Sequence, residues 1–172
     1  MTSVMLRRRL LLGAAAALHV SGAAAGAPAN ARLFARRSDN ILILLLDDQP
    51  VHVFRAAFGR EHGHKQIRDD ARTPVGDYTV FPARRSARWK WFHAIDYPNV
   101  RDVAAGRRRG LSREALGDEI GIHGHGGWPP TDLVASHGMS WNWTAGCISV
   151  NDTEIETVRE FVVRPMPIRI EG

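Results

Sequence analysis

The sequence predicts a mainly β domain, a sandwich or a barrel-like sheet with a few short helices. Two observations lead to this fold class. Short apolar segments of strand length recur along the chain with turn residues between them, and only one segment near the C-terminus shows well-marked helical spacing. A chain of 172 residues can bury one sizeable core but hardly two, so we expect a single domain.

The first 29 residues have the composition of an export signal. Arg7, Arg8 and Arg9 form a positively charged start, and an apolar stretch from Leu10 to Val20 follows, with small residues after it. The stretch is shorter than the ~20 residues that a transmembrane helix needs. We therefore predict a signal peptide over residues 1–29 and a mature protein in the periplasm or cell envelope, without a later transmembrane segment. Twin-arginine export and an uncleaved anchor stay open as alternatives.

The first strands of the domain are predicted as a hairpin. Residues 40–46 are apolar almost throughout and residues 50–55 alternate, while Asp47 to Gln49 between them are typical of a turn. The preceding residues 30–38, rich in small residues and arginine, are predicted to be a linker, so that the domain covers residues 39–172. Further apolar runs predict strands over residues 78–81, 90–95, 119–123, 147–150 and 166–170.

Two helices and one long loop complete the predicted fold. Residues 99–110 suggest a short helix. After Asn151, which can cap a helix together with Glu154, apolar residues recur at helical spacing as far as Val162. Residues 124–143 form a glycine-rich loop, and a loop of this length in a small domain usually has a function. Its tryptophans, which either line a cleft or pack the loop, are Trp128, Trp141 and Trp143.

The charge of the chain gives little reason to expect a polyanionic partner. The formal net charge is +5, but residues 1–29 carry three arginines and no acidic residue, so the remaining chain carries +2. The hydrophobic fraction of 44% and the charged fraction of 24% are ordinary for a globular protein. We therefore expect a folded domain with no nucleic-acid partner.

The single cysteine, Cys147, is either a small buried residue or a reactive group. It cannot form an internal disulfide, and an unpaired thiol in an exported protein is open to oxidation. A cysteine nucleophile needs a base within hydrogen-bond reach. No histidine follows Cys147, which excludes the cysteine-first order of papain-like peptidases, so the base must lie upstream.

His123 is the best candidate for that base. It ends an apolar strand, and Gly124 after it lets a substrate backbone approach closely. Cys147 begins another strand after the small-residue turn 144–146, whose backbone N–H groups can point toward a developing oxyanion. Two strand ends that face one crevice predict a catalytic dyad.

These residues belong to motifs that resemble those of YkuD-type L,D-transpeptidases. The family signature is an I-H-G strand end followed, after a variable loop, by [S/T]-x-G-C-[I/V], and the chain has Ile122-His123-Gly124 and Thr144-Ala145-Gly146-Cys147-Ile148. Its segment Arg72-Thr73-Pro74-Val75-Gly76-Asp77-Tyr78 is similar to the family's T-P-x-G-x-[YF]. Two further segments resemble the YafK-like branch of the family: Gly63-His64-Lys65-Gln66 and Asp96-Tyr97-Pro98-Asn99. The resemblance covers roughly residues 39–170.

The resemblance implies an L,D-transpeptidase-type β fold and acyl transfer on the tetrapeptide stems of peptidoglycan. His123 would take the thiol proton of Cys147, and the resulting imidazolium–thiolate pair would attack the stem, release D-alanine and form a thioester. An amine would then complete a 3→3 cross-link or attach an envelope lipoprotein. With water as acceptor, the protein would be an L,D-carboxypeptidase, or an amidase that hydrolyses lipoprotein–peptidoglycan bonds. The resemblance implies no cofactor and no metal.

The residues expected to bind substrate are Gly146, Thr144, Gly124, Arg72 and His64. For His64 and Arg72, anchoring of a loop by hydrogen bonds is the alternative. Two positions depart from the family pattern, because Ser149 stands where many members carry Arg or Asn, and Ala145 where many carry His. These departures leave open how the stem-peptide carboxylate is held.

Two other functions are kept as alternatives. The histidine pairs His62/His64 and His123/His125 have the spacing at which a strand presents two ligands on one face, which suggests a zinc peptidase. The chain has no H-E-x-x-H, however, and such an enzyme would leave Cys147 without a role. The other alternative is a wall-binding module that keeps the fold without catalysis.

Overall fold

The protein is described by a computed structural model over residues 30–127 and 141–172. Five strands form the first sheet, in the order β3 (Gln49–Arg55), β2 (Ile41–Leu46), β1 (Ala31–Arg36), β9 (Met166–Glu171) and β4 (Gly76–Val80). Four strands form the second sheet, in the order β5 (Arg84–Ser86), β6 (Lys90–Ala94), β7 (Gly121–His123) and β8 (Ile148–Ser149). Each sheet has one parallel pair, β1 with β9 and β7 with β8. The predicted mainly β fold class is confirmed.

The prediction of a linker over residues 30–38 is wrong for most of its length. Residues 31–36 form β1, which lies at the centre of the first sheet between β2 and β9. Ala31, Leu33 and Ala35 are buried, and the residues between them are less so. Because two of the inward side chains are only alanine and two of the outward ones are arginine, the period-two pattern of a strand was hard to recognise.

The predicted hairpin is confirmed as β2 and β3. Asp47 and Asp48 connect the two strands with φ angles of 48° and 63°, as in the two-residue turns that suit antiparallel strands. Leu42 and Leu44 of β2 are fully buried. β3 is an edge strand of the sheet, which explains why most of its side chains are exposed.

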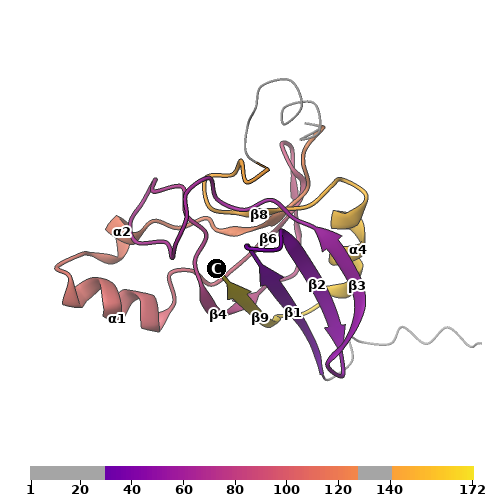
Figure 1. Cartoon of the computed structure of the whole chain (residues 1–172), viewed down its shortest axis with the longest axis horizontal. Helices are drawn as coiled ribbons and strands as arrows, with labels where there is room; N and C mark the ends of the chain where they lie inside the picture. Colours follow the sequence, from indigo (N-terminus) through magenta and orange to yellow (C-terminus); the bar gives the residue numbers. More distant parts are fainter. Residues whose placement is uncertain (1–29, 128–140) are drawn as a thin grey trace, which may run out of the picture.

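Three helices lie within the described residues. α1 (Val100–Arg108) and α2 (Arg113–Leu116) lie together at one end of the molecule, and α4 (Glu154–Phe161) packs near β6 at the other (Figure 1). None of the helices in the described part of the chain is both long and apolar enough to cross a bilayer. The predicted signal peptide, Trp128 and much of the predicted loop lie outside the described residues.

Asparagine side chains cap the starts of α1 and α4, of which the sequence suggested the second. Asn99 accepts the N–H groups at the start of α1. Before α4, the Asn151 side chain accepts the N–H of Glu154 at 2.7 Å, and the Glu154 carboxylate accepts the N–H of Asn151 at 3.0 Å. This reciprocal pair is the predicted capping box, which satisfies backbone donors that the helix itself cannot bond.

One hydrophobic core joins both sheets and α4. Leu33 and Ile168 come from the first sheet, Ile122 and Ile148 from the second, and Ile155 from α4. Each of these residues is at most 1% exposed to solvent. Burial of each such side chain stabilises the fold by about 1.5–3 kcal/mol relative to leaving it exposed. The core therefore fixes β7 and β8, whose ends carry the two predicted catalytic residues.

Candidate active site

The two predicted catalytic residues lie at the ends of neighbouring strands, His123 at the end of β7 and Cys147 just before β8. The strands run parallel, and His123 pairs with Ser149. Cys147 stands directly before β8, so the same register sets it level with Gly121. Because paired residues share a face of the sheet and side chains alternate along a strand, Cys147 and His123 belong to the same face, diagonally opposite each other.

The sulfur of Cys147 lies against the backbone at the start of β7. The thiol donates to the carbonyl oxygen of Glu119 at 3.5 Å and accepts a hydrogen bond from the backbone of Gly121. It lines a pocket of about 210 Å³ that also contains Lys65. The residue as a whole is partly exposed, but burial of its sulfur raises the pKa of Cys147 to about 11. The Gly121 bond and the charge of Lys65 act in the opposite direction.

His123 is held by stacking on its ring and by a hydrogen bond at one nitrogen. The side chain is almost completely buried, Trp89 stacks on it with ring centroids 4.4 Å apart, and Nδ1 lies 2.7 Å from the carbonyl oxygen of Gly124. Because a carbonyl can only accept, Nδ1 of the neutral ring carries the proton and Nε2 keeps a lone pair. A backbone carbonyl is therefore the group that orients the imidazole.

The pKa shifts of the two residues favour a neutral thiol and a neutral imidazole. Burial raises the pKa of Cys147 to about 11 and lowers that of His123 to about 4. The imidazolium–thiolate pair implied by the resemblance would need the pKa of His123 to lie above that of Cys147, which is the reverse of this order. Poor hydration disfavours both charges, so the arrangement suits a base that takes the proton during attack rather than before it.

The turn before Cys147 is organised by Thr144. Its Oγ1 donates to the carbonyl of Cys147 at 2.7 Å and accepts the N–H of Gly146 at 3.1 Å. Gly146 has a φ of 137°, and a Cβ at this position would lie 2.7 Å from the carbonyl oxygen of Arg72. Thr144 and Gly146 therefore set the direction in which the chain enters Cys147, and the Gly146 N–H is already bonded.

Gly124 lies at a point where the fold leaves no room for a side chain. A Cβ there would lie 2.5 Å from a carboxylate oxygen of Asp152 and 2.9 Å from the carbonyl oxygen of Trp89. The same carboxylate accepts the N–H groups of Gly126 and Gly127, each at 2.9 Å. The close approach predicted at Gly124 is thus an approach of protein atoms, and it holds the end of β7 in place.

The remaining predicted substrate residues lie in the segment that leads to β4. His64 accepts the N–H of Val75 at 3.0 Å, and burial lowers the pKa of His64, so this residue anchors its loop. Arg72 approaches the Cys147 turn through its carbonyl, which lies against Gly146. Among the described residues, the Nε of Arg72 is buried without a hydrogen-bond partner.

The first histidine pair does not form a metal site. His62 contacts the guanidinium of Arg37, with Nδ1 2.7 Å from Nη1, whereas His64 bonds to backbone. Within residues 30–127 and 141–172, no three His, Cys, Asp or Glu side chains are grouped to hold a metal ion.

Trp89 is the site residue that the sequence did not reveal. It follows β5 in the turn to β6, and the pairing of β6 with β7 brings this turn beside His123. Trp143 lies near both, with ring centroids 5.9 Å from Trp89 and 6.1 Å from His123. The only signal in the sequence was the density of arginine and tryptophan over residues 84–91, which by itself does not indicate a partner.

A comparison with protein-family models assigns the chain to a family. The model of the YkuD family, described as the L,D-transpeptidase catalytic domain, matches residues 30–170. The chain belongs to this family. The resemblance seen in the sequence is confirmed at the level of the L,D-transpeptidase domain family, and the YafK-like branch stays a prediction.

Solved structures share the fold of this L,D-transpeptidase domain. The helical cell shape determining protein Pgp2 from Campylobacter jejuni aligns with a TM-score of 0.65 at 22% identity, over 83% of this chain and 47% of that one. Bd1075 from Bdellovibrio bacteriovorus aligns with a TM-score of 0.57 at 18% identity, over 82% and 47%. An L,D-transpeptidase from Xylanimonas cellulosilytica gives 0.52 at 15%, over 83% and 61%. The chain spans about half the length of the first two. A comparison with curated protein sequences finds no significant match.

Proposed function

We propose that this protein is an exported L,D-transpeptidase, a cysteine acyltransferase that acts on the tetrapeptide stems of peptidoglycan in the cell envelope. The observation that supports the proposal best is the register of β7 and β8, in which His123 pairs with the second residue after Cys147. The Gly124 carbonyl supports it further, because a proton fixed on Nδ1 leaves Nε2 of His123 able to accept another.

In the proposed acylation step, Nε2 of His123 accepts the thiol proton while the sulfur of Cys147 attacks the carbonyl carbon of the third stem residue. The carbonyl oxygen becomes an oxyanion. Since the Gly146 N–H already bonds to Thr144, we assign the oxyanion to the backbone N–H of Cys147. The C–N bond then breaks, the proton passes from His123 to the departing amine of D-alanine, and a thioester remains.

In the proposed second step, an amine attacks the thioester carbonyl and gives its proton to His123. The C–S bond breaks, and the proton returns to the sulfur of Cys147. A stem amine produces a 3→3 cross-link, and a lipoprotein amine produces an attached lipoprotein. Water in place of the amine would release a free carboxylic acid, which is the hydrolase alternative. The choice depends on how well the bound acyl group is shielded from water.

The remaining predicted site residues have different proposed roles. Arg72 is proposed to contact the donor peptide, because its buried Nε has no partner in the described part of the chain and its backbone lies against the turn before Cys147. Thr144, Gly146 and Gly124 are proposed to shape the cleft through the backbone. His64 is proposed to act only through its loop, since its Nδ1 is occupied by Val75.

The test of this proposal is the reaction of the purified protein with disaccharide-tetrapeptide, with products identified by mass spectrometry. Dimers that lack one D-alanine show transpeptidation, and tripeptides show hydrolysis. Cys147→Ala should abolish both products, and His123→Ala should reduce the rate by about 100- to 10,000-fold, the usual contribution of a positioned base. His52→Ala, which removes an exposed histidine of β3, is the matched control and should change little.

A second readout follows the thioester itself. A carbapenem, whose strained carbonyl acylates cysteine transpeptidases, should add its mass to the wild-type protein and leave Cys147→Ala unmodified. Unchanged stem peptide together with an unmodified Cys147 would overturn the proposal. Tight binding of stem peptide without any acyl-enzyme would instead support the wall-binding module.

A further inference from the structure

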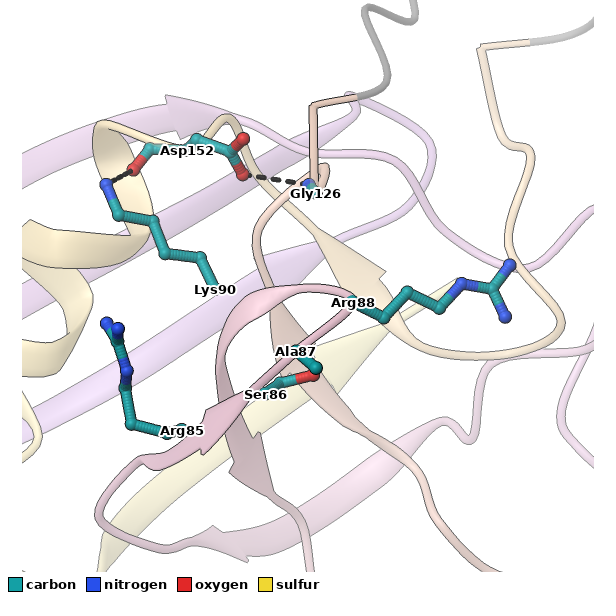
Figure 2. A pocket seen from close by; sticks show the side chains of 7 residues that line it. All are labelled: Arg85, Ser86, Ala87, Arg88, Lys90, Gly126 and Asp152. Atoms are coloured by element: carbon teal, nitrogen blue, oxygen red, sulfur yellow. Dashed lines mark hydrogen bonds between the residues drawn. The ribbon is translucent and has the colours of Figure 1, made fainter.

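A second pocket, separate from the one at Cys147, opens beside the β5–β6 hairpin. Its volume is about 670 Å³, which is the size of pockets that bind small organic ligands. The residues that line it are Arg85, Ser86, Ala87, Arg88, Lys90, Gly126 and Asp152 (Figure 2). Gly126 belongs to the segment that follows His123, so one wall of the pocket is formed by residues just beyond β7.

Two arginines give this pocket a positive charge that the protein does not balance. Lys90 is neutralised, because its Nζ lies 3.1 Å from the Glu156 carboxylate and donates to the carbonyl oxygen of Asp152. The carboxylate of Asp152 is itself occupied by two backbone N–H groups. Among the residues that the structure describes, neither Arg85 nor Arg88 pairs with a carboxylate.

Both guanidinium groups are instead held on tryptophan rings. The guanidinium carbon lies 4.8 Å from the ring centroid of Trp91 in the case of Arg85, and 4.3 Å from that of Trp89 in the case of Arg88. Stacking of this kind covers one face of the guanidinium and leaves the N–H donors at its edge free. Figure 2 shows the two arginines extending to different sides of the hairpin turn, so one small anion would meet only one of them.

Arg88 is the arginine that is connected to the candidate base, His123, through a shared stacking partner. The indole of Trp89, on which Arg88 stacks, is the ring that also stacks on His123. Burial is the largest cause of the lowered pKa of His123, and the charge of Arg88 adds to it. An anion bound at Arg88 would cancel this contribution and make His123 a better proton acceptor when substrate is present.

A carboxylate is the anion that best fits these observations. The planar edge of a guanidinium donates two parallel hydrogen bonds to a carboxylate, and a stacked arginine loses little freedom when it does so. The pocket is too large for a lone ion, and the indole of Trp89 lies between Arg88 and the imidazole of His123. Its ligand should therefore be part of a larger molecule that extends past Trp89 toward His123. A stem peptide carries carboxylates on its terminal D-alanine and on the side chain of its third residue.

We propose that Arg88 binds a carboxylate of the acyl-donor peptide and thereby determines which stems the enzyme accepts. The proposal rests on the transpeptidase function proposed above. Arg88 is then a specificity-determining residue that favours donor peptides with a carboxylate at this position. Arg85 is a second cation of the same pocket and is not essential for that contact.

The experiment measures binding of synthetic tetrapeptides to the full protein carrying Cys147→Ala, by isothermal titration calorimetry. The three ligands are the free tetrapeptide, its C-terminal amide and its amide at the third-residue side chain. Arg88→Gln should weaken binding of the free tetrapeptide about tenfold, the usual effect of losing a charged hydrogen bond. The same substitution should leave unchanged the binding of whichever amide lacks the recognised carboxylate, which also identifies that carboxylate.

Two further arginine variants make this result specific. Arg55→Gln is the matched control, because Arg55 stacks on Trp141 at 4.2 Å in the same manner but does not line the pocket. Arg85→Gln tests the other cation of the pocket and should have less effect than Arg88→Gln. Arg88→Lys, which keeps the charge and loses the planar edge, should fall between wild type and Arg88→Gln. Unchanged circular dichroism of each variant shows that the fold is intact.

The outcomes separate this proposal from the proposed function. Equal weakening of all three peptides by Arg88→Gln, or equal effects of the three Gln variants, would overturn the role of Arg88. If the carbapenem still acylates Cys147 in that case, the transpeptidase proposal survives alone. Binding of inorganic polyphosphate that depends on Arg88, with no such dependence for the peptides, would show that the pocket serves a phosphate polymer and would also overturn the proposal.

Discussion

At the scale of single residues, Cys147 and His123 are kept neutral by the same cause. Burial raises the pKa of the thiol to about 11 and lowers that of the imidazole to about 4. A thiol with such a pKa has very little thiolate at neutral pH, and thiolate is the form that reacts with oxidants and disulfides. An unpaired cysteine in an oxidising compartment would thus be protected until a substrate lies in place and His123 takes the proton.

The reactivity of Cys147 toward iodoacetamide should therefore be low at neutral pH and rise with pH. Because alkylation requires the thiolate, the rate should grow about tenfold per pH unit above neutrality and level off only near pH 11. Mass spectrometry of samples quenched over time gives the rate. The protein unfolded in urea is the control and should level off near the ordinary thiol pKa of about 8.5. A plateau of the native rate below pH 8 would contradict the neutral resting pair.

The sequence singled out the two candidate catalytic side chains but not their surroundings. Cys147 and His123 were recognisable because each stands at a strand end next to a glycine, a local pattern. Trp89 was not, because its contact with His123 depends on the pairing of β6 with β7, which joins distant parts of the chain. The pKa order of the two residues was equally hidden, since it depends on hydration in the folded state.

At the scale of elements, the segments with clear apolar patterns were predicted, whereas β1, β5 and α2 were not. The β2–β3 hairpin and α4 have clear apolar spacing and turn or cap residues, and both were recognised. β5 and α2 contain only three and four residues, too few to show a period. β1 was taken for a linker because alanine and arginine weaken its alternation, although it is central to the sheet.

The turn between Thr144 and Cys147 is the element on which the candidate nucleophile depends most. Gly146→Ala should destabilise the protein by about 1–3 kcal/mol through backbone strain at a φ of 137°. It should also displace the turn, because the new Cβ would lie 2.7 Å from the rigid carbonyl of Arg72. We expect a lower melting temperature and loss of carbapenem acylation at temperatures where the variant is still folded.

Gly110→Ala is the matched control for this substitution. Gly110 also has a positive φ, of 76°, but a Cβ there would meet no atom within 4 Å. This variant should show only the strain of the left-handed backbone, about 1 kcal/mol, with acylation unchanged. Normal acylation in Gly146→Ala would mean that the turn can shift without moving the sulfur.

At the scale of the whole molecule, the fold buries imidazoles within its second sheet. His93 is fully buried on β6, with Nδ1 2.9 Å from the carbonyl oxygen of Phe81. His123 is almost as deeply buried on β7. Burial lowers the pKa of each to about 4. The same low hydration that suits the candidate base therefore makes the native state less able than the unfolded chain to bind protons in weak acid.

The stability of the domain should consequently fall as the pH is lowered from about 6.5 to about 4. Over this range both histidines stay neutral when folded, whereas the unfolded chain binds a proton at each, so the free energy of unfolding decreases with decreasing pH. Each histidine contributes at most about 1.4 kcal/mol per pH unit. Urea unfolding at a series of pH values measures the slope. His93→Asn, which keeps a donor for the Phe81 carbonyl, should reduce the slope by the share of this imidazole even if the variant is less stable overall. His123, His64 and His125, whose pKa values burial also lowers, account for the rest. A slope that is the same in wild type and His93→Asn would show that this imidazole is hydrated enough to protonate within the native sheet. The account of His123 as a neutral base depends on the same burial and would then lose its main support.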